Sequence, residues 1–294
     1  MQVLVTGGSG FIGRALCQQL LQAGHHPTVL TRDVRAAAHR LPGVRLIGAL
    51  DELERADAAV TLAGESLTAG RWNARRKQAF RDSRIGTTQR LLAWLQQRQT
   101  RPAVLVSGSA IGYYGPRDDT PLDETAAPGN DFAARLCRDW ETEAAKAAGL
   151  GVRVCLLRTG IVLGADGGAL GKMLPPFRLG LGGPMGSGRQ WMSWVHRADL
   201  VRLILWLLES QDGSGAYNAT APHPVTNREF AQTLGRVLRR PALLTTPAPA
   251  LRLMFGEMAD LLLTGQRVVP QRAQAQGFEF AHPQLEQALR DLLA

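Results

Sequence analysis

The chain has 294 residues, of which 45% are hydrophobic and 20% charged. These values are typical of a soluble globular protein and argue against intrinsic disorder. The formal charge is +9 and is carried almost wholly by arginine, because lysine occurs only as Lys77, Lys146 and Lys172. The arginines are scattered and follow no nucleic-acid-binding motif. The charge therefore favours an anionic ligand, such as a phosphorylated cofactor, over nucleic acid.

The first residues, MQVLVTGGSGF, lack the basic and long apolar regions of a secretory signal peptide. No stretch approaches the roughly 18 apolar residues of a membrane span. Cys17, Cys137 and Cys155 are odd in number and widely spaced, as is typical of reduced, buried thiols. We therefore expect a cytoplasmic protein with no membrane partner and no nucleic-acid partner.

Short apolar strands alternate with helical stretches through the first half of the chain. The predicted strands cover 3–6, 27–32, 44–48, 58–64, 103–110 and part of 152–164, and the predicted helices cover 12–23, 73–97 and 131–148. The strands are almost continuously apolar, which is typical of a parallel sheet that helices cover on both faces. This order predicts an α/β fold, a Rossmann-type doubly wound parallel sheet.

The composition changes in the second half. Residues 164–188 are dense in Gly and Pro, so we predict an irregular lobe or lid beside the site instead of a core element. A helix over 196–210 and a strand over 215–220 return to the sheet. A helix over 226–238 begins with Thr226 as N-cap and Glu229 completing a capping box. We expect three parts: 1–163 as the nucleotide-binding core, 164–240 as the lobe with returning core elements, and 241–294 as a helical C-terminal extension.

The stretch VLVTGGSGFIG carries most of the functional inference. Gly7, Gly10 and Gly13 follow a predicted strand and open a predicted helix. In a dinucleotide-binding loop the first glycine permits a tight turn, the second lets the backbone approach a pyrophosphate, and the third lets the helix pack on the strand. Phe11 and Ile12 contribute backbone N–H groups at the helix N-terminus, which favours anions.

The second predicted strand ends in Thr31 and Arg32. An NAD-specific site normally has Asp or Glu at this strand end, where the carboxylate bonds the ribose 2′-hydroxyl. An arginine instead bonds a 2′-phosphate in a bidentate manner. The sequence therefore predicts NADP (NADPH) as the cofactor. The alternative is that Arg32 is a solvated surface residue beside Asp33.

The spacing G-x-x-G-x-x-G resembles that of the short-chain dehydrogenase/reductase superfamily, in particular its extended, epimerase-like branch. TLAGE, SRIGTTQRLL, VSGSAIGYYG and GSGRQWMSWVHRADL resemble further elements of that branch. The subgroup it most resembles is the epimerase family proteins that contain LRTGIVLG and KMLPPFRLGLGGPMGSGRQ and a C-terminal extension of unknown function. The similarity covers almost the whole chain. It implies that cofactor contacts extend to Leu62, Ala63, Gly64, Arg84 (or Ser83) and Ser107, and that Ser109 occupies the position of a catalytic Ser or Thr.

The chain departs from the family pattern at the acid/base pair. Active members use a Tyr with a Lys four residues later, but Tyr113, Tyr114 and Tyr217 are followed at that distance by Arg117, Asp118 and Ala221. Alignment with the family places Phe132 and Leu136 at the two positions. Met192 stands where nucleotide-sugar enzymes carry an Arg that binds the diphosphate, which weakens a nucleotide-sugar prediction.

Other residues are candidates for the chemistry. Ser109 is expected to polarise a carbonyl or hydroxyl of the substrate, and Tyr113 is an additional phenol that could carry the proton. Substrate contacts are expected from residues that have equally plausible structural roles, namely Glu65, Lys172, Arg178, Arg189 and His196. His196 is also expected at a helix start, where its role would be structural. The histidines and cysteines show no metal-ligand spacing, so no metal site is predicted.

Two functions fit these observations. The first is an NADP-dependent oxidoreductase or epimerase-like enzyme of the atypical extended short-chain type, acting on an unidentified small molecule. The alternative is a non-catalytic NADP-binding sensor or scaffold, which would need no replacement for the missing pair. Analogy with the fold suggests a homodimer formed through the helices near 73–97 and 131–148.

Overall fold

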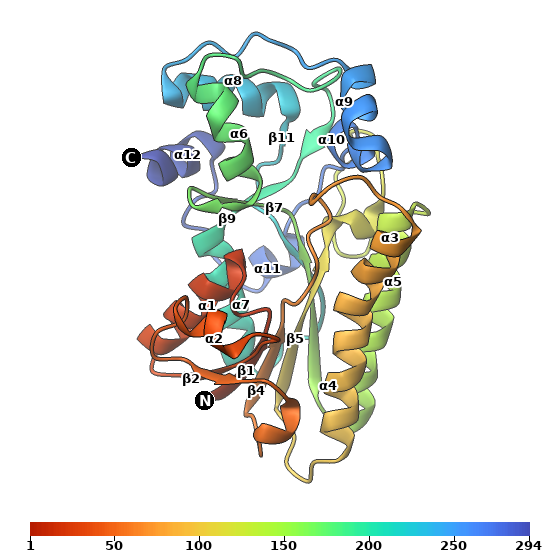
Figure 1. Cartoon of the computed structure of the whole chain (residues 1–294), viewed down its shortest axis with the longest axis vertical. Helices are drawn as coiled ribbons and strands as arrows, with labels where there is room; N and C mark the ends of the chain where they lie inside the picture. The colour runs from red at the N-terminus through yellow and green to blue at the C-terminus, as the bar shows by residue number, and fades with distance from the viewer.

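The computed structural model describes residues 1–294. Its centre is a seven-stranded parallel sheet with the order β10-β6-β5-β4-β1-β2-β3, visible edge-on in the lower half of Figure 1. The strands are β1 (Gln2–Thr6), β2 (His26–Leu30), β3 (Arg45–Ile47), β4 (Ala58–Thr61), β5 (Val104–Ala110), β6 (Arg153–Thr159) and β10 (Gly215–Ala219). From β1 the strands are added toward one edge of the sheet as β2 and β3, and from β4 onward toward the other edge. The strand order therefore reverses between β1 and β4, which creates the crevice where such sheets bind ligands. The predicted Rossmann-type fold class is confirmed.

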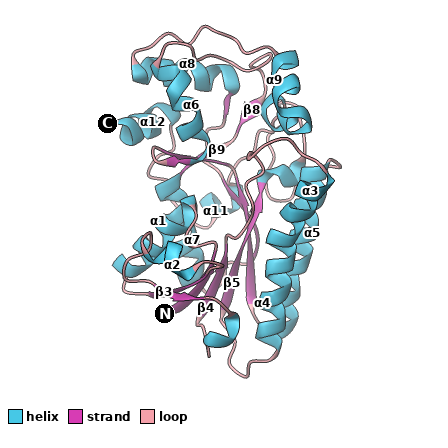
Figure 2. Cartoon of the chain, in the orientation of Figure 1, coloured by secondary structure: helices cyan, strands magenta, loops and turns pink.

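Helices cover both faces of the sheet (Figures 1 and 2). One face packs against α1 (Phe11–Gln22), α2 (Val34–Ala38) and α7 (Arg197–Glu209), and the other against α4 (Thr87–Gln96) and α5 (Phe132–Ala145). Val5, Leu16 and Ile204 in the first layer and Leu4, Leu91 and Leu105 in the second have almost no exposed surface. The strands are apolar on both sides because both sides are buried.

The predicted helix over 73–97 is divided. It consists of α3 (Ala74–Arg81), a π-helical turn η2 (Asp82–Gly86) and α4. Such turns are frequent at functional sites, and this one carries Ser83 and Arg84. Short 3₁₀ segments complete this half of the chain: η1 (Leu50–Glu52), η3 (Ile111–Tyr114) and η4 (Lys146–Leu150).

A lobe with its own hydrophobic core stands beyond the carboxyl ends of the strands (Figure 1). It contains α6 (Gly168–Arg178), α8 (Asn227–Leu238) and the strand pairs β7–β9 and β8–β11. These strands are β7 (Ile161–Gly164), β8 (Trp191–Met192), β9 (Trp194–His196) and β11 (Val225–Thr226). The predicted capping box of Thr226 and Glu229 at α8 is confirmed.

Residues 164–188 lie in the lobe, but the prediction that they hold no core element was wrong for their first half. Leu170, Leu174 and Phe177 lie on one side of α6 and are buried in the core of the lobe. This apolar spacing of four and three residues is helical, and it outweighs the unfavourable propensity of Pro175 and Pro176 inside the helix. Tertiary packing decided the outcome, since burying three large side chains contributes about 1.5–3 kcal/mol each.

The C-terminal region joins the lobe to the sheet. Its elements are α9 (Ala248–Phe255), η5 (Gly256–Ala259), α10 (Asp260–Leu263), α11 (Gln271–Ala275) and α12 (Leu285–Leu293). Helix α12 packs on α8 in the lobe, whereas Val268 bridges to Leu122 and the Tyr217 hydroxyl of β10 donates to Gln276. No helix has the length and apolar character needed to cross a membrane.

Candidate cofactor and active site

The glycine loop between β1 and α1 is closely packed by backbone alone. Gly7 has φ +74°, and a Cβ there would lie 2.6 Å from the Ala63 nitrogen. A Cβ on Gly13 would lie 2.3 Å from the Gly7 oxygen, so only glycine lets α1 approach the turn. Gly10 caps α1 without a side chain. Its Cβ would meet only the Gly7 oxygen within 4 Å, so the space in front of the first α1 N–H groups is open to an anion.

The ends of β1 and β4 lie side by side beneath this loop. The Leu62 backbone N–H donates to the Thr6 carbonyl at 3.0 Å, and the Ala63 N–H to the Thr6 hydroxyl at 3.4 Å. One strand further, the buried Ser107 accepts a hydrogen bond from the Thr61 hydroxyl at 3.1 Å. The residues expected along the cofactor thus come together at one edge of the sheet.

The lobe touches the nucleotide loop at Phe11. A Cβ on Gly164, Gly167 or Gly168 would lie within 3 Å of the Phe11 ring, so these glycines allow the lobe to cover Phe11. The guanidinium carbon of Arg197 lies 4.7 Å from the Phe11 ring centre, and Arg197 pairs with Asp166 at 2.5 Å. The sequence indicated that 164–188 is rich in glycine, but it gave no sign that the contact is with Phe11.

Arg32 lies two residues after β2, is exposed and forms no ion pair. Its neighbour Asp33 is not its partner: the Asp33 carboxylate caps α2 by accepting from the Ala36 N–H at 2.9 Å. An unpaired guanidinium at this strand end is the arrangement that would bind a 2′-phosphate.

Arg84 reaches back from the π-helical turn to the end of β4. Its guanidinium donates to the Glu65 carbonyl at 3.0 Å and lies 5.6 Å from the Trp140 ring centre. A Cβ on Gly64 would lie 2.9 Å from the guanidinium carbon, so the two are in direct contact. Burial lowers the pKa of Arg84, with Cys137 and Glu65 opposing that shift. Ser83 supports the same segment by accepting from the Glu65 N–H at 3.0 Å.

Ser109, at the end of β5, takes part in a buried polar network. Its hydroxyl donates to Glu141 of α5 at 2.6 Å. Glu141 in turn accepts two hydrogen bonds from Arg158 of β6, each at 2.9 Å. The side chains of Glu141 and Arg158 are only 8% and 6% exposed. Ser109 has a single proton, which this arrangement directs to Glu141, so its oxygen faces other ligands only as an acceptor.

The network continues from Arg158 to two neighbouring tyrosines. Arg158 donates to the Tyr114 hydroxyl at 2.9 Å, and that hydroxyl donates to Asn218 at 2.7 Å. Burial raises the pKa of Tyr114 to about 12, although Arg158 and Asn218 act in the opposite direction. Burial alone would lower the pKa of Arg158, but its hydrogen bonds and charge interactions with Glu141 and Tyr114 raise it overall.

Tyr113 is the phenol that remains free. Its ring centre lies 3.5 Å from the guanidinium carbon of Arg158. The side chain is half-buried, and the phenolic hydrogen bonds of this turn are made by the Tyr114 hydroxyl and not by that of Tyr113. The sequence motifs pointed to Tyr113 and Ser109 but not to Glu141 or Arg158. A charged residue inside the apolar stretch VCLLRTG was the available signal for Arg158.

The first turns of α5 pack against two neighbouring segments. Ala133 and Cys137 lie against η3, because a Cβ on Gly112 would lie 3.4 Å and 3.9 Å from their side chains. Phe132 packs edge-on against Trp72 with ring centres 5.3 Å apart. Burial raises the pKa of the Cys137 thiol to about 12, with Glu141 adding to that shift, which makes it unsuited to proton transfer near neutral pH.

The expected substrate contacts are dispersed. Glu65 follows β4 and its carboxylate lies 3.6 Å from Arg76. Lys172 joins α6 to the loop after Glu65 by donating to the Thr68 hydroxyl at 2.8 Å. Arg178 and Arg189 are exposed and form no ion pair. The structure therefore keeps Glu65 and Lys172 near one another through a shared loop, while the two arginines lie on the surface of the lobe.

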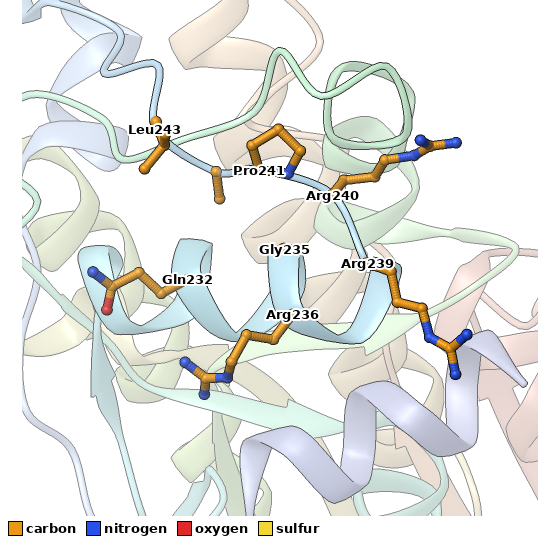
Figure 3. A pocket seen from close by; sticks show the side chains of 8 residues that line it. Gln232, Gly235, Arg236, Arg239, Arg240, Pro241 and Leu243 are labelled. Atoms are coloured by element: carbon orange, nitrogen blue, oxygen red, sulfur yellow. The ribbon is translucent and has the colours of Figure 1, made fainter.

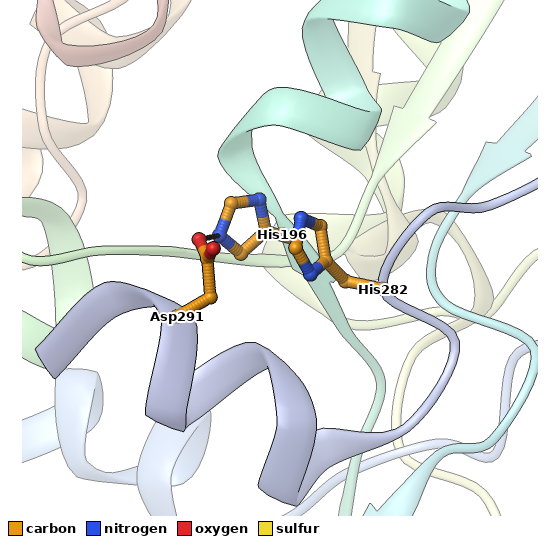
Figure 4. A group of neighbouring side chains, drawn as sticks. All are labelled: His196, His282 and Asp291. Carbon is orange, nitrogen blue, oxygen red and sulfur yellow. Dashed lines mark ion pairs between the residues drawn. The ribbon is translucent and has the colours of Figure 1, made fainter. Parts of the chain in front are cut away.

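His196 faces the C-terminal region instead of a substrate. Its Nδ1 accepts from the Ala198 N–H at 3.1 Å and caps α7. Its Nε2 lies 3.3 Å from Asp291, and its ring stacks on His282 with centres 3.9 Å apart (Figure 4). The expectation of a substrate contact is thereby corrected: the residue is 5% exposed and acts at a helix start, which was the structural alternative.

His196, His282 and Asp291 each offer one ligand atom within 4.8 Å of the others. A histidine that binds a metal donates its other ring N–H to an acceptor. The Nδ1 of His196 instead faces the Ala198 N–H, which is a donor, so the proton belongs on Nε2, which lies 3.3 Å from Asp291 without forming a hydrogen bond. The donor set therefore does not fit a metal centre.

Two family models match this chain. Residues 3–220 match a model of the NAD dependent epimerase/dehydratase family, and residues 246–292 match a domain of unknown function, DUF1731. The epimerase family protein SDR39U1 homolog, chloroplastic, of Arabidopsis thaliana is 42% identical over all of this chain and 87% of its own length. The human epimerase family protein SDR39U1 is 41% identical, and the alignment covers both chains completely.

A solved structure extends the similarity to three dimensions. The crystal structure of human epimerase family protein SDR39U1 (isoform 2) with NADPH superposes with a TM-score of 0.92 at 39% identity, over 99% of each chain. The family match covers well over half of this chain, and the relatives align from end to end. The chain therefore belongs to the NAD dependent epimerase/dehydratase family.

Proposed function

We propose that the protein binds NADPH and is an oxidoreductase of the atypical extended short-chain dehydrogenase/reductase type, acting on an unidentified small molecule. The observation that carries the cofactor assignment is the open α1 N-terminus at Gly10 together with the unpaired Arg32 after β2. The human relative of 39% identity was crystallised with NADPH, which supports the same choice.

The residues present fit the cofactor from end to end. Arg32 would hold the 2′-phosphate, Gly10 and the first turn of α1 the pyrophosphate, and Leu62 to Gly64 the face of the dinucleotide. Arg84, in contact with Gly64, would add a cation along the same surface. When bound, NADPH supplies a hydride at its nicotinamide, while the protein orients the substrate and moves the proton.

The proton transfer is assigned to Tyr113, with Ser109 placed to orient the reacting oxygen. In the reductive direction Tyr113 donates its phenolic proton to the carbonyl oxygen as the hydride reaches the carbonyl carbon. Because its own proton is directed to Glu141, Ser109 can accept a hydrogen bond from the hydroxyl that forms. Arg158 serves both, because it fixes Glu141 by two hydrogen bonds and stacks on Tyr113. No Lys follows any Tyr at the family spacing. The cation in contact with the Tyr113 ring is instead Arg158.

Turnover of a panel of carbonyl compounds with NADPH tests the enzyme assignment. We expect Tyr113→Phe to lower turnover by about 100-fold or more, the usual size of general acid catalysis, with the Kd for NADPH unchanged. Tyr217→Phe is the matched control, since Tyr217 lies on β10 and its hydroxyl binds Gln276. Equal turnover in the wild type and in Tyr113→Phe would rule out Tyr113.

The second candidate function is a non-catalytic NADPH-binding sensor or scaffold. The absence of a Tyr-x-x-x-Lys pair and the engagement of the Ser109 proton by Glu141 favour it. Tight NADPH binding without oxidation of NADPH by any carbonyl compound above the solvent background would establish this function. Failure to bind NADPH at all would contradict both proposals.

A further inference from the structure

The end of the lobe furthest from the sheet exposes four large apolar side chains. Leu179 and Leu181 follow α6 and are 73% and 58% exposed, and Leu243 and Leu244 are 82% and 53% exposed. The two segments lie together, because the Leu244 N–H donates to the Gly182 carbonyl at 3.3 Å. We call this surface, Arg178–Leu181 with Arg239–Leu244, the lobe tip. Exposed apolar clusters rimmed by charge mark interaction sites.

The lobe tip itself carries only positive charge, and the acidic Glu286 lies 3.5 Å from Arg236 at its rim. Residues 167–188 and 230–256 contain no Asp or Glu, whereas they contain six cations: Lys172, Arg178, Arg236, Arg239, Arg240 and Arg252. Arg178, Arg239 and Arg240 are exposed and none of them forms an ion pair. The lobe tip therefore combines uncompensated positive charge with exposed leucines.

A shallow pocket lies where the two properties meet. It is bounded by the end of α8 and by the segment that follows, with Arg236, Arg239 and Arg240 around it and Pro241 and Leu243 on its rim (Figure 3). Arg239 has φ +54°, the only positive value outside glycine. The chain turns there, and Figure 3 shows Arg239 and Arg240 extending in different directions from this turn.

We propose that the lobe tip is a docking surface for an anionic membrane. The arginines would bind lipid phosphates while the leucines enter the boundary between headgroups and acyl chains. The like charge of two lobe tips opposes pairing with a second copy, and exposed leucines contribute nothing to a phosphate-backbone contact with nucleic acid. The expectation of no membrane partner rested on the lack of a spanning segment, which a peripheral surface does not require.

Co-sedimentation of the intact protein with vesicles tests the proposal. We expect binding to vesicles of phosphatidylcholine with phosphatidylglycerol, no binding to phosphatidylcholine alone, and loss of binding at high salt. Arg239→Ala/Arg240→Ala should weaken the partition by about 25-fold, at roughly fivefold per charge. The variant Leu179→Ser/Leu181→Ser/Leu243→Ser should also lose binding, which separates insertion from simple charge attraction.

Matched controls lie on other faces of the molecule. Arg90→Ala/Arg135→Ala removes the same charge from exposed positions of α4 and α5, and Leu21→Ser changes a partly exposed leucine of α1. Both should bind as the wild type does, and every variant should keep its NADPH affinity. Wild-type protein that stays in the supernatant with anionic vesicles at low salt overturns the proposal. An equal loss of vesicle binding in Arg90→Ala/Arg135→Ala also overturns it. Two further results would do the same: dimers in light scattering that form through the lobe tip, or salt-sensitive binding of the lobe tip to duplex DNA.

Discussion

The nucleotide loop and the Ser109 network lie at the same edge of the sheet, but they are built differently. The loop is a run of seven residues, Gly7 to Gly13, whose constraints come from backbone and from the lack of a Cβ. The Ser109 network joins side chains of four elements, β5, α5, β6 and η3. A local backbone requirement leaves a motif in the sequence, whereas a network assembled across the fold leaves only isolated charged residues in apolar stretches.

The largest expected effect is a loss of stability when the Ser109 network is broken. Arg158→Met would leave the Glu141 carboxylate buried without its partner, which costs about 3–5 kcal/mol in the free energy of unfolding. Urea denaturation measures this loss. Arg81→Met is the control, since Arg81 pairs with Asp139 at a site where both side chains are more than one-third exposed, and such pairs contribute no more than about 1 kcal/mol. Similar losses in the two variants would mean that the network is no more critical than the surface.

A substitution in the glycine loop should lower the affinity for NADPH and not the stability of the fold. Gly10→Val places a branched side chain where the pyrophosphate would approach, so we expect the NADPH affinity to fall by about 100-fold, equivalent to one or two charge-assisted hydrogen bonds. Fluorescence titration measures it. Gly86→Ala is the control, because a Cβ there meets nothing within 4 Å. Retained affinity in Gly10→Val would refute the assignment of the loop.

A smaller loss of affinity is expected at Arg32, which would contact the 2′-phosphate end of the cofactor. Arg32→Ala should weaken NADPH by about 10-fold to 100-fold, since a hydrogen bond to a charged group contributes about 1.5–3 kcal/mol, and should leave NADH unchanged. Arg35→Ala, an exposed arginine of α2, should alter neither. Parallel losses for the two nucleotides would contradict the role of Arg32 at the 2′-phosphate.

The smallest expected effect is on the pH dependence of stability. It concerns His196, a buried neutral group, in contrast to the buried charges of the Ser109 network. Burial, with the charge of His282, lowers the pKa of His196 below its ordinary value of 6.5. As the pH falls through that value, the unfolded chain binds a proton before the folded chain does, so stability is present at neutral pH and decreases on acidification. His196→Asn keeps a capping side chain, and its Tm should decline less between neutral and mildly acidic pH. An identical decline in both proteins would place the titrating group elsewhere.

Much of the fold followed from local patterns. The apolar strands predicted the doubly wound sheet, and Thr226 with Glu229 predicted the start of α8. The lobe was harder, because Pro175, Pro176 and several glycines concealed the apolar face of α6. The residues of α5 that pack on η3 could not be identified from the sequence, since a helix rotates its side chains by 100° per residue and only the contact with Gly112 shows that Ala133 and Cys137 lie there.

The sequence by itself determined the nucleotide-binding end of this protein: Gly7, Gly10, Gly13 and Arg32 act through properties of the residue or its immediate neighbours. Only the tertiary structure decided the surroundings of Ser109 and Tyr113. Glu141 and Arg158 lie 32 and 49 residues beyond Ser109 in the chain, and they become its neighbours because β5 and β6 pair in register and α5 packs across them. Burying these charges requires mutual hydrogen bonds, so folding itself selects the arrangement that positions the two candidate catalytic groups.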